Sequence, residues 1–329
     1  MSVPSIAIGG YFAIERGLGA GLSWIDEAIG YRSARSALAS IFAVNRPAAV
    51  WVPNFICSAV TDALRSRDID IRRYALSKSL GLTEQTTLAQ DELLLCVDYF
   101  GINAAEIDRA IARFGHDRVI VDASQALFHS HRTGCTTIYS PRKFLGVPDG
   151  GLLRTARMLG ERIDPVEADS IARSQHLLYR LSGEIDTGYR NFHEAEASLA
   201  GCQSIAMSRL TDAILRSTDI DKVASLRVRN YHYLSELLRM SGMQVQDLPA
   251  NAVPLCCPVR CHDAAKLRLR LVTQGIFTPT YWPDAIIPAD DRVALSMRDQ
   301  TVYLPCDQRY GEPELDYVAK TMIDSTGAS

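Results

Sequence analysis

The sequence predicts an α/β protein in which a mostly parallel sheet lies between helices, followed by a smaller α+β lobe. Its 329 residues exceed one average domain, which favours two lobes with a sizeable core. Short apolar segments alternate with amphipathic ones between residues 33 and 125, as in a parallel sheet wrapped by helices. Apolar residues make up 47% and charged residues 22%, as is typical of a globular enzyme-sized protein.

The elements of the expected sheet follow one another along the first half of the chain. Strands are expected at 49–52, 69–74, 93–97 and 119–121, and helices at 33–42, 58–65 and 104–114. Parallel sheets place ligands at the carboxyl ends of their strands. Asp98 and Asp122 directly follow apolar segments, so we expect both at such ends.

The second half is expected to begin with helices and to end with a separate lobe. The pattern is helical from about 158 to 238, with breaks near 182–183 and 187–188 and a long helix within 208–238. After residue 242, strands are expected at 253–259 and 302–304, and helices at 262–274 and 314–322. The sequence therefore predicts a large domain at 1–238 and a small α+β domain at 239–329.

Several classes of protein are excluded by composition. The formal net charge is −3 and no basic stripe is visible, so no nucleic-acid partner is expected. The N-terminal segment lacks a basic start and a long apolar run, and no stretch of about 18 apolar residues occurs, so we expect a cytoplasmic protein without a membrane span. The eight cysteines are expected to be buried thiols. Cys256, Cys257, Cys261 and His262 are not expected to bind a metal, because neighbouring strand residues face opposite sides.

Asp122 and Lys143 together indicate pyridoxal 5′-phosphate (PLP). A lysine amine forms a Schiff base with the cofactor aldehyde, and a carboxylate pairs with the protonated ring nitrogen. The chain has only five lysines, and Lys143 lies in a segment with few charges, just before Asp149-Gly-Gly151. An isolated Asp after a strand is more often a helix cap or a surface acid, and a lone Lys is usually solvated. The pair, 21 residues apart, favours the cofactor.

Two segments are expected to bind the cofactor phosphate. Ser140 lies three residues before Lys143, so its hydroxyl can bind the phosphate while the amine reaches the aldehyde. The helix start at Ala34, Arg35 and Ser36 offers unpaired N–H groups, with the Arg35 guanidinium as a counter-charge. The other interpretation of this helix start is an ordinary serine N-cap.

Taken together, these motifs resemble the fold-type-I PLP enzymes, and among them the DegT-type sugar-nucleotide aminotransferases. The resemblance is carried along nearly the whole chain by Ile8-Gly-Gly-Tyr-Phe12, Ser33-Ala-Arg-Ser-Ala-Leu38, Val52-Pro-Asn-Phe-Ile-Cys57, Val121-Asp-Ala-Ser-Gln125, Arg142-Lys-Phe144, Arg229-Asn-Tyr231, Tyr281-Trp-Pro283 and Leu304-Pro-Cys-Asp-Gln-Arg-Tyr310. It implies a seven-stranded sheet and an aminotransferase that uses PLP. It also implies transfer of an amino group, with glutamate as donor, to a keto sugar attached to a nucleotide.

The same resemblance implies roles for single residues. Asp122 meets the ring nitrogen, Gln125 contacts the phenolic side of the cofactor, and Lys143 is both the Schiff base and the proton carrier. Where the family has a glycine, a stacking aromatic residue and a serine, this chain has Ala34, Cys57 and Ile138. Stacking is therefore expected from Tyr99 or Phe55, and Ser140 is expected to replace the missing serine.

The resemblance further implies a homodimer with a shared active site. The stretch 183–201, with Arg190 and Asn191, is the candidate segment that reaches the partner's site; its alternative interpretation is an exposed helical hairpin. Tyr281 is the third candidate substrate contact. An alternative function is a regulatory or non-catalytic protein of this fold in surface-polysaccharide assembly, which the loss of the stacking aromatic at Cys57 favours.

Overall fold

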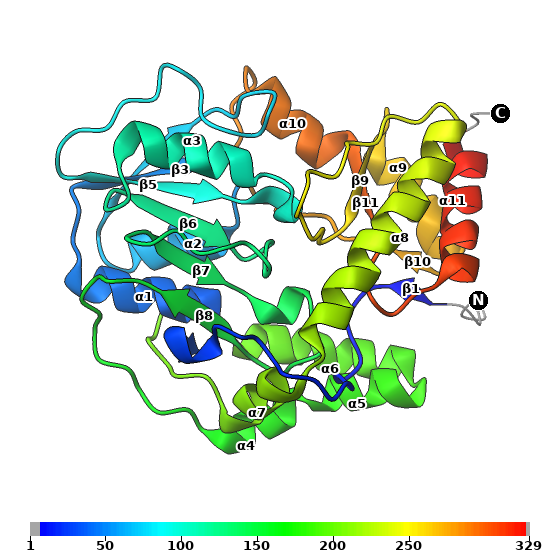
Figure 1. Ribbon diagram of the computed structural model, residues 1–329, viewed down its shortest axis with the longest axis horizontal. Coiled ribbons are helices and arrows are strands. Elements are labelled where there is room, and N and C mark those ends of the chain that lie inside the picture. Colours follow the sequence, from blue (N-terminus) through cyan, green and yellow to red (C-terminus); the bar gives the residue numbers. More distant parts are fainter. Residues whose placement is uncertain (1–6, 327–329) are drawn as a thin grey trace.

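A seven-stranded, mostly parallel sheet forms the centre of the larger lobe (Figure 1). The computed structural model describes residues 7–326. Residues 1–6 of the predicted large domain and residues 327–329 of the predicted small domain lie outside this range. The strand order is β2-β8-β7-β6-β5-β3-β4, and only β8 runs against its two neighbours. The strands are β2 (Ile29–Tyr31), β3 (Ala49–Pro53), β4 (Asp70–Tyr74), β5 (Glu92–Val97), β6 (Val119–Ala123), β7 (Thr136–Tyr139) and β8 (Gly151–Arg154).

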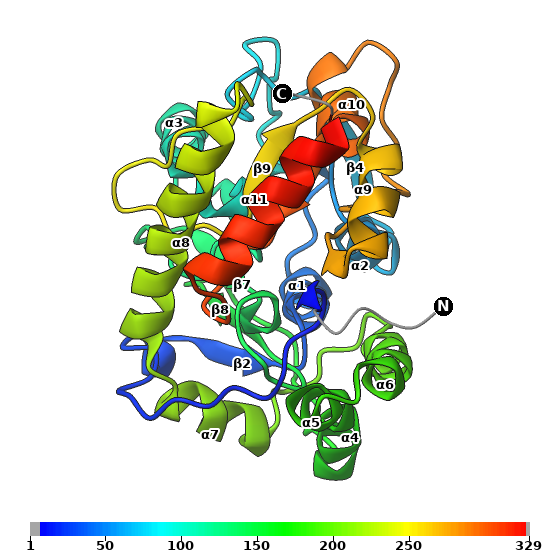
Figure 2. The ribbon, with the colours of Figure 1, turned by 90° about the vertical axis from the view of Figure 1, so that its right-hand side faces the viewer.

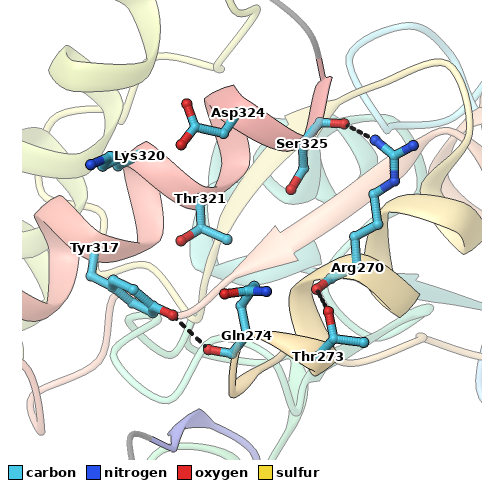
Figure 3. A pocket seen from close by; sticks show the side chains of 8 residues that line it. All are labelled: Arg270, Thr273, Gln274, Tyr317, Lys320, Thr321, Asp324 and Ser325. Carbon is cyan, nitrogen blue, oxygen red and sulfur yellow. Dashed lines mark hydrogen bonds between the residues drawn. The ribbon is translucent and has the colours of Figure 1, made fainter. Parts of the chain in front are cut away.

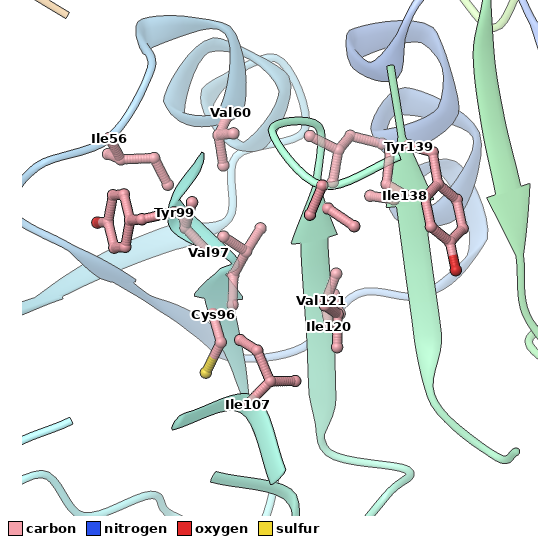
Figure 4. Packing of buried hydrophobic residues seen from close by; sticks show 14 of the residues in the cluster. Ile56, Val60, Cys96, Val97, Tyr99, Ile107, Ile120, Val121, Ile138 and Tyr139 are labelled. Carbon is pink, nitrogen blue, oxygen red and sulfur yellow. The ribbon is translucent and has the colours of Figure 1, made fainter. Parts of the chain in front are cut away.

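Helices cover both faces of this sheet. In Figure 1, α3 (Ala104–Phe114) lies on one face, and α1 (Ala34–Val44) and α2 (Ser58–Arg65) on the other. Every residue of β5 and β6 is buried, as expected for strands covered on both faces. Figure 4 shows the resulting packing, with buried apolar side chains on β5 (Val97), β6 (Val121) and β7 (Ile138). The fold class predicted from the sequence is therefore confirmed for this lobe.

A run of helices follows the sheet, as predicted. It comprises α4 (Glu167–Arg173), α5 (Gln175–Ser182), α6 (Ile185–Ser198), α7 (Arg209–Ser217) and α8 (Ile220–Met240). The break near 182–183 is confirmed, but the one near 187–188 is wrong. Gly188 lies inside α6, where a Cβ would stand 2.3 Å from the hydroxyl oxygen of Tyr11. This glycine therefore permits a close approach of the N-terminal segment and does not form a turn.

The smaller lobe has its own hydrophobic core. This lobe contains two short sheets, the antiparallel pair β9 and β11 and the parallel pair β1 and β10. Figure 2 shows α11 lying across β9. Cys256 lies in the core of the larger lobe and Cys257 in that of the smaller lobe, as expected for neighbours that face opposite sides. The elements are β1 (Ile8–Gly9), β9 (Cys257–Arg260), α9 (Ala264–Thr273), β10 (Ile276–Phe277), α10 (Arg292–Asp299), β11 (Thr301–Leu304) and α11 (Glu312–Thr326).

Helix α8 connects the two cores. Val223 near its start belongs to the core of the larger lobe, whereas Tyr231, Leu234 and Leu238 belong to the second core. The predicted boundary between residues 238 and 239 stays a prediction, because this helix serves both lobes. No helix within residues 7–326 is both long and apolar enough to cross a bilayer.

Candidate active site

A hollow of about 200 Å³ lies at the carboxyl ends of β5 and β6, next to the start of α1. Six of the residues predicted from the sequence line it together: Ala34, Arg35, Asp122, Gln125, Ser140 and Lys143. They come from α1, from the end of β6 and from the 3-10 turn η3 (Pro141–Lys143). The edge of the sheet expected to bind a ligand is therefore the edge where these side chains meet.

Asp122 presents one free carboxylate oxygen. It is the fourth residue of β6, only 6% exposed, and lies beside Val97 of β5 and Ile138 of β7. Its Oδ1 atom accepts a hydrogen bond from the Ser124 backbone N–H at 2.9 Å and another from the Ser124 hydroxyl. Both bonds end on Oδ1, and no donor within residues 7–326 binds Oδ2. Asp122 lines the hollow, and a carboxylate oxygen without a protein donor there is suited to a protonated ring nitrogen of a ligand.

Gln125 presents an unused donor. Its side chain is 1% exposed, and its Oε1 atom accepts from the Phe100 backbone N–H at 3.2 Å. In the described part of the chain, the buried Nε2 atom has no partner. An unpaired buried donor is costly, so a ligand oxygen in the hollow would satisfy it.

The start of α1 is shaped for an anion. Ser33 is the N-cap, and its hydroxyl oxygen accepts from the Ser36 N–H at 3.2 Å. The N–H groups of Ala34 and Arg35 have no backbone partner within residues 7–326. Gly151 lets β8 pass directly against this turn, because a Cβ there would stand 2.4 Å from the Ala34 nitrogen. The Nε atom of Arg35 is buried and has no partner among residues 7–326. Helix N–H groups and a guanidinium suit a phosphate.

The backbone beside Lys143 is fixed by both lobes. The Lys143 N–H donates to the Ser140 carbonyl oxygen at 3.1 Å. The next carbonyl, of Phe144, accepts from Arg227 Nη2 at 3.1 Å and from Gln308 Nε2 at 2.8 Å. Arg227 is fully buried in α8, with its guanidinium 4.7 Å from the centre of the Phe144 ring. Arg227 and Gln308 were not found from the sequence, because only the folded chain brings them to Lys143.

A second buried network holds the segment after Lys143. Asp149 is fully buried and accepts from the Ser170 hydroxyl at 2.6 Å, the Ser208 hydroxyl at 3.1 Å and Arg173 Nη2 at 3.3 Å. These donors lie on α4 and at the start of α7. The turn expected at Asp149 to Gly151 is thus anchored through its acid. Gly151 packs against the start of α1, and the Gly150 N–H donates to the Arg32 carbonyl oxygen.

Among the other residues that line the hollow are some to which the sequence analysis gave no role at the site. Arg142 and Glu196 form an ion pair across it, and burial lowers the pKa of the Arg142 guanidinium to about 10, although the nearby Asp149 carboxylate acts in the opposite direction. Leu199 and Trp282 complete this side. Trp282 has a left-handed backbone (φ 47°) and lies in the loop between β10 and α10, with its side chain in the core of the larger lobe.

Five predicted residues lie outside this hollow. Ser36 is buried behind the N-cap, and Tyr99 donates from its hydroxyl to the Phe55 carbonyl oxygen at 2.6 Å. The Tyr281 ring packs on the Tyr303 ring, 4.8 Å between centres. On α6, Arg190 is exposed, and Asn191 Nδ2 donates to the Thr187 carbonyl oxygen at 3.0 Å. Neither aromatic candidate for stacking, Tyr99 or Phe55, reaches the hollow; the aromatic side chain that lines it is Trp282.

The charges of the hollow favour an anionic ligand. Its lining holds three cations (Arg35, Arg142 and Lys143) and two acids (Asp122 and Glu196), an excess of one positive charge. The start of α1 adds the positive end of a helix dipole. The unused Gln125 donor, the free Asp122 oxygen and this positive surface fit the phenolic oxygen, ring nitrogen and phosphate of PLP respectively.

A larger hollow of about 540 Å³ lies between α9 and α11 (Figure 3). Two hydrogen bonds drawn there join the helices: Arg270 to the Ser325 carbonyl oxygen at 2.6 Å, and the Tyr317 hydroxyl to the Gln274 carbonyl oxygen at 3.0 Å. Lys320 and several other polar side chains line it, but none of the predicted site residues does. The chemistry predicted from the sequence therefore belongs to the smaller hollow.

No family model matches the sequence, and no curated protein matches it. Solved structures do match the fold. The aminotransferase TlmJ from Streptoalloteichus hindustanus is 14% identical with a TM-score of 0.65, over 92% of this chain and 86% of TlmJ. DesV of S. venezuelae is 20% identical with a TM-score of 0.62, over 90% and 84%. Spr1654 from Streptococcus pneumoniae in its PLP form is 13% identical with a TM-score of 0.63, over 97% and 93%.

These similarities confirm the fold predicted from the sequence, that of the fold-type-I PLP-dependent aminotransferases. They span almost the full length of both chains in each comparison. The sequence identities are too low to carry more than the fold.

Proposed function

We propose that this chain is a PLP-dependent aminotransferase that transfers an amino group, with glutamate as donor, to a nucleotide-linked keto sugar. The observation that carries the proposal is that the Asp122 carboxylate and the Lys143 side chain line one hollow with the positive start of α1. The structural similarity to sugar aminotransferases such as CalS13 from Micromonospora echinospora supports the substrate class. A cytoplasmic location stays a prediction.

In this proposal each group of the hollow holds one part of PLP. Asp122 Oδ2 binds the ring nitrogen and keeps it protonated, and Gln125 Nε2 donates to the phenolic oxygen. The start of α1, Arg35 and Ser140 bind the phosphate. When bound, PLP accepts electrons from the bond that is broken at the substrate carbon.

Lys143 has two tasks in this scheme. Its amine binds the cofactor between turnovers and gives up that place to the amino donor. Its Nζ atom would then be the base that moves a proton at the substrate carbon. A positioned amine beside the reacting carbon is a general base of the kind this task requires. The Phe144 carbonyl, held by Arg227 and Gln308, keeps the lysine backbone in place.

The half-reaction with glutamate tests the function. We expect the protein, loaded with PLP, to be yellow, and glutamate without sugar to bleach the colour and release 2-oxoglutarate in a 1:1 ratio to active sites. D-Glutamate is the matched control. A protein that binds PLP but releases no 2-oxoglutarate would support the alternative function, a non-catalytic or regulatory protein of this fold, which the position of Cys57 at the hollow favours.

We also propose that two copies form a dimer through the α4–α6 region. These helices pack on one another and expose large apolar side chains, as docking surfaces do. Helix α6 also bears the exposed Arg190 and the half-buried Asn191, which we propose contact the substrate in the partner's site. The exposed apolar residues of this region are Val166, Ile171, Leu178, Tyr179, Leu181 and Tyr189.

The double variant Ile171→Asp with Leu178→Asp should be monomeric at micromolar concentration, because two charges would lose their solvation in an apolar interface. Light scattering coupled to gel filtration measures this. Leu269→Asp is the matched control, since Leu269 is also an exposed apolar residue (71%) but lies on α9. A wild-type monomer that still transaminates would refute the shared site.

A further inference from the structure

Arg142 and Glu196 form an ion pair inside the proposed active site. Arg142 directly precedes Lys143 in η3, and Glu196 lies in the last turn of α6. Both side chains line the hollow that Lys143 and Asp122 line. Their Nη2 and Oε1 atoms are in contact. The anion that pairs with Arg142 is therefore a carboxylate of the protein itself, and it lines the same hollow as the lysine that an amino donor must displace.

The two partners differ in how much they depend on the pair. The Arg142 side chain is 19% exposed and its guanidinium is desolvated, so it needs an anion. The Glu196 side chain is 42% exposed and can be solvated by water when it leaves. The pair is thus suited to exchange, because another carboxylate can take the place of Glu196 while Arg142 remains paired.

Helix α6 weakens the hold of Glu196. The negative end of a helix dipole lies at the C-terminus, where acids are disfavoured and basic residues are favoured. Glu196 lies two residues before the end of α6 (Ile185–Ser198), and no basic residue lies in that last turn. The helix therefore gains no stability from the position that Glu196 has in the ion pair, and Glu196 can move away without loss of a favourable interaction with the helix end.

We propose that Arg142 binds the α-carboxylate of the amino-acid donor, and that Glu196 occupies this position until the donor enters. The inference rests on the proposed function for the place of the reacting amine at Lys143. A carboxylate is favoured over a nucleotide phosphate because Glu196 already fills the position with a carboxylate. The planar guanidinium matches that group with two parallel N–H donors.

Glutarate binding tests the inference without any turnover. We expect Arg142→Ala to weaken glutarate binding, measured by calorimetry, about 10-fold or more, as for loss of a charge-assisted hydrogen bond. Glu196→Gln should tighten it, because the internal competitor is neutral, and Arg142→Lys should bind with intermediate strength. Arg132→Ala is the matched control, since Arg132 pairs with Asp108 at similar exposure but outside the hollow.

Two results would overturn the inference: unchanged glutarate binding in Arg142→Ala, or weaker binding in Glu196→Gln. A nucleoside diphosphate is titrated in parallel, and loss of its binding alone in Arg142→Ala would assign this residue to a phosphate. The titrations are made with and without PLP. Glutarate binding through Arg142 in a protein that never attaches PLP would refute the proposed function but not the carboxylate site. An Arg142→Ala variant that transaminates with a normal half-saturation for glutamate would refute the carboxylate site but not the proposed function.

Discussion

Replacing Asp122 by Asn should lower the turnover about 100-fold or more while the protein still folds and binds PLP. The Asn side chain can keep its oxygen on the two Ser124 donors that Asp122 uses now. Its amide nitrogen would then face the hollow in place of Oδ2, and it can donate but not accept from a protonated ring nitrogen. Loss of a charge-assisted hydrogen bond costs about 1.5–3 kcal/mol, and each 1.36 kcal/mol of barrier is tenfold in rate. Loss of the protonated ring adds to this.

Single-turnover kinetics with glutamate measure the effect, and PLP titration shows that binding remains. Asp98→Asn is the matched control, because Asp98 is also a buried acid at the end of a strand of the same sheet. Its carboxylate accepts from the His129 ring at 2.6 Å and from the Asn103 backbone N–H at 2.9 Å, and it does not line the hollow. This control should lower the unfolding midpoint but leave the turnover of the folded protein unchanged. Near-normal turnover in Asp122→Asn would place the ring nitrogen elsewhere.

Helices and strands whose apolar residues follow a clear local pattern could be predicted from the sequence. The predicted helices 58–65 and 104–114 match α2 and α3 residue for residue, because their apolar residues recur at helical spacing. Buried β5 and β6 appear in the sequence as short apolar runs. The strands that escaped prediction are short or mixed in polarity, as β7 is with Thr136 and Thr137, and only pairing with neighbours defines them.

The same division holds for the site. Asp122, Gln125, Ser140 and Lys143 lie within 22 residues of one another and follow two neighbouring strands, so strand-end reasoning brings them together. Trp282 comes from the loop between β10 and α10, more than 130 residues away in the sequence. No local pattern connects it with Lys143.

The expectation that Tyr99 or Phe55 stacks on the cofactor stays a prediction, and it depends on packing that chemical type alone does not describe. Tyr99 is the second residue after β5, and Asp122 lies near the end of β6. The Tyr99 hydroxyl, however, donates to the Phe55 carbonyl oxygen inside the core. Its ring packs beside Trp282, with 6.0 Å between centres, so Tyr99 supports the aromatic side chain that lines the hollow. Which of two neighbouring aromatic residues reaches a ligand depends on packing between the lobes.

Replacing Lys143 by Ala should abolish covalent attachment of PLP and reduce transamination to the background of the solution. The structure offers a reason to expect a single site of attachment. Lys143 is half-buried and lines the hollow, whereas the four other lysines, all within residues 7–326, are exposed: Lys78, Lys222, Lys266 and Lys320. A cofactor whose phosphate and ring are held in the hollow presents its aldehyde to the amine that lines the hollow, and not to an amine on the surface.

Borohydride reduction of the PLP-loaded protein, followed by peptide mapping, measures the attachment. All of the reduced cofactor should be on the peptide that contains Lys143, and none should be fixed in Lys143→Ala. Lys320→Ala is the matched control, because Lys320 lines the larger hollow between α9 and α11 and should leave labelling unchanged. Arg227 and Gln308 bind the Phe144 carbonyl oxygen, which neither Lys143→Ala nor Lys320→Ala removes. If Lys143→Ala loses labelling while its unfolding midpoint is unchanged, the loss is therefore due to the missing amine. Labelling at any of the four exposed lysines would refute the assignment.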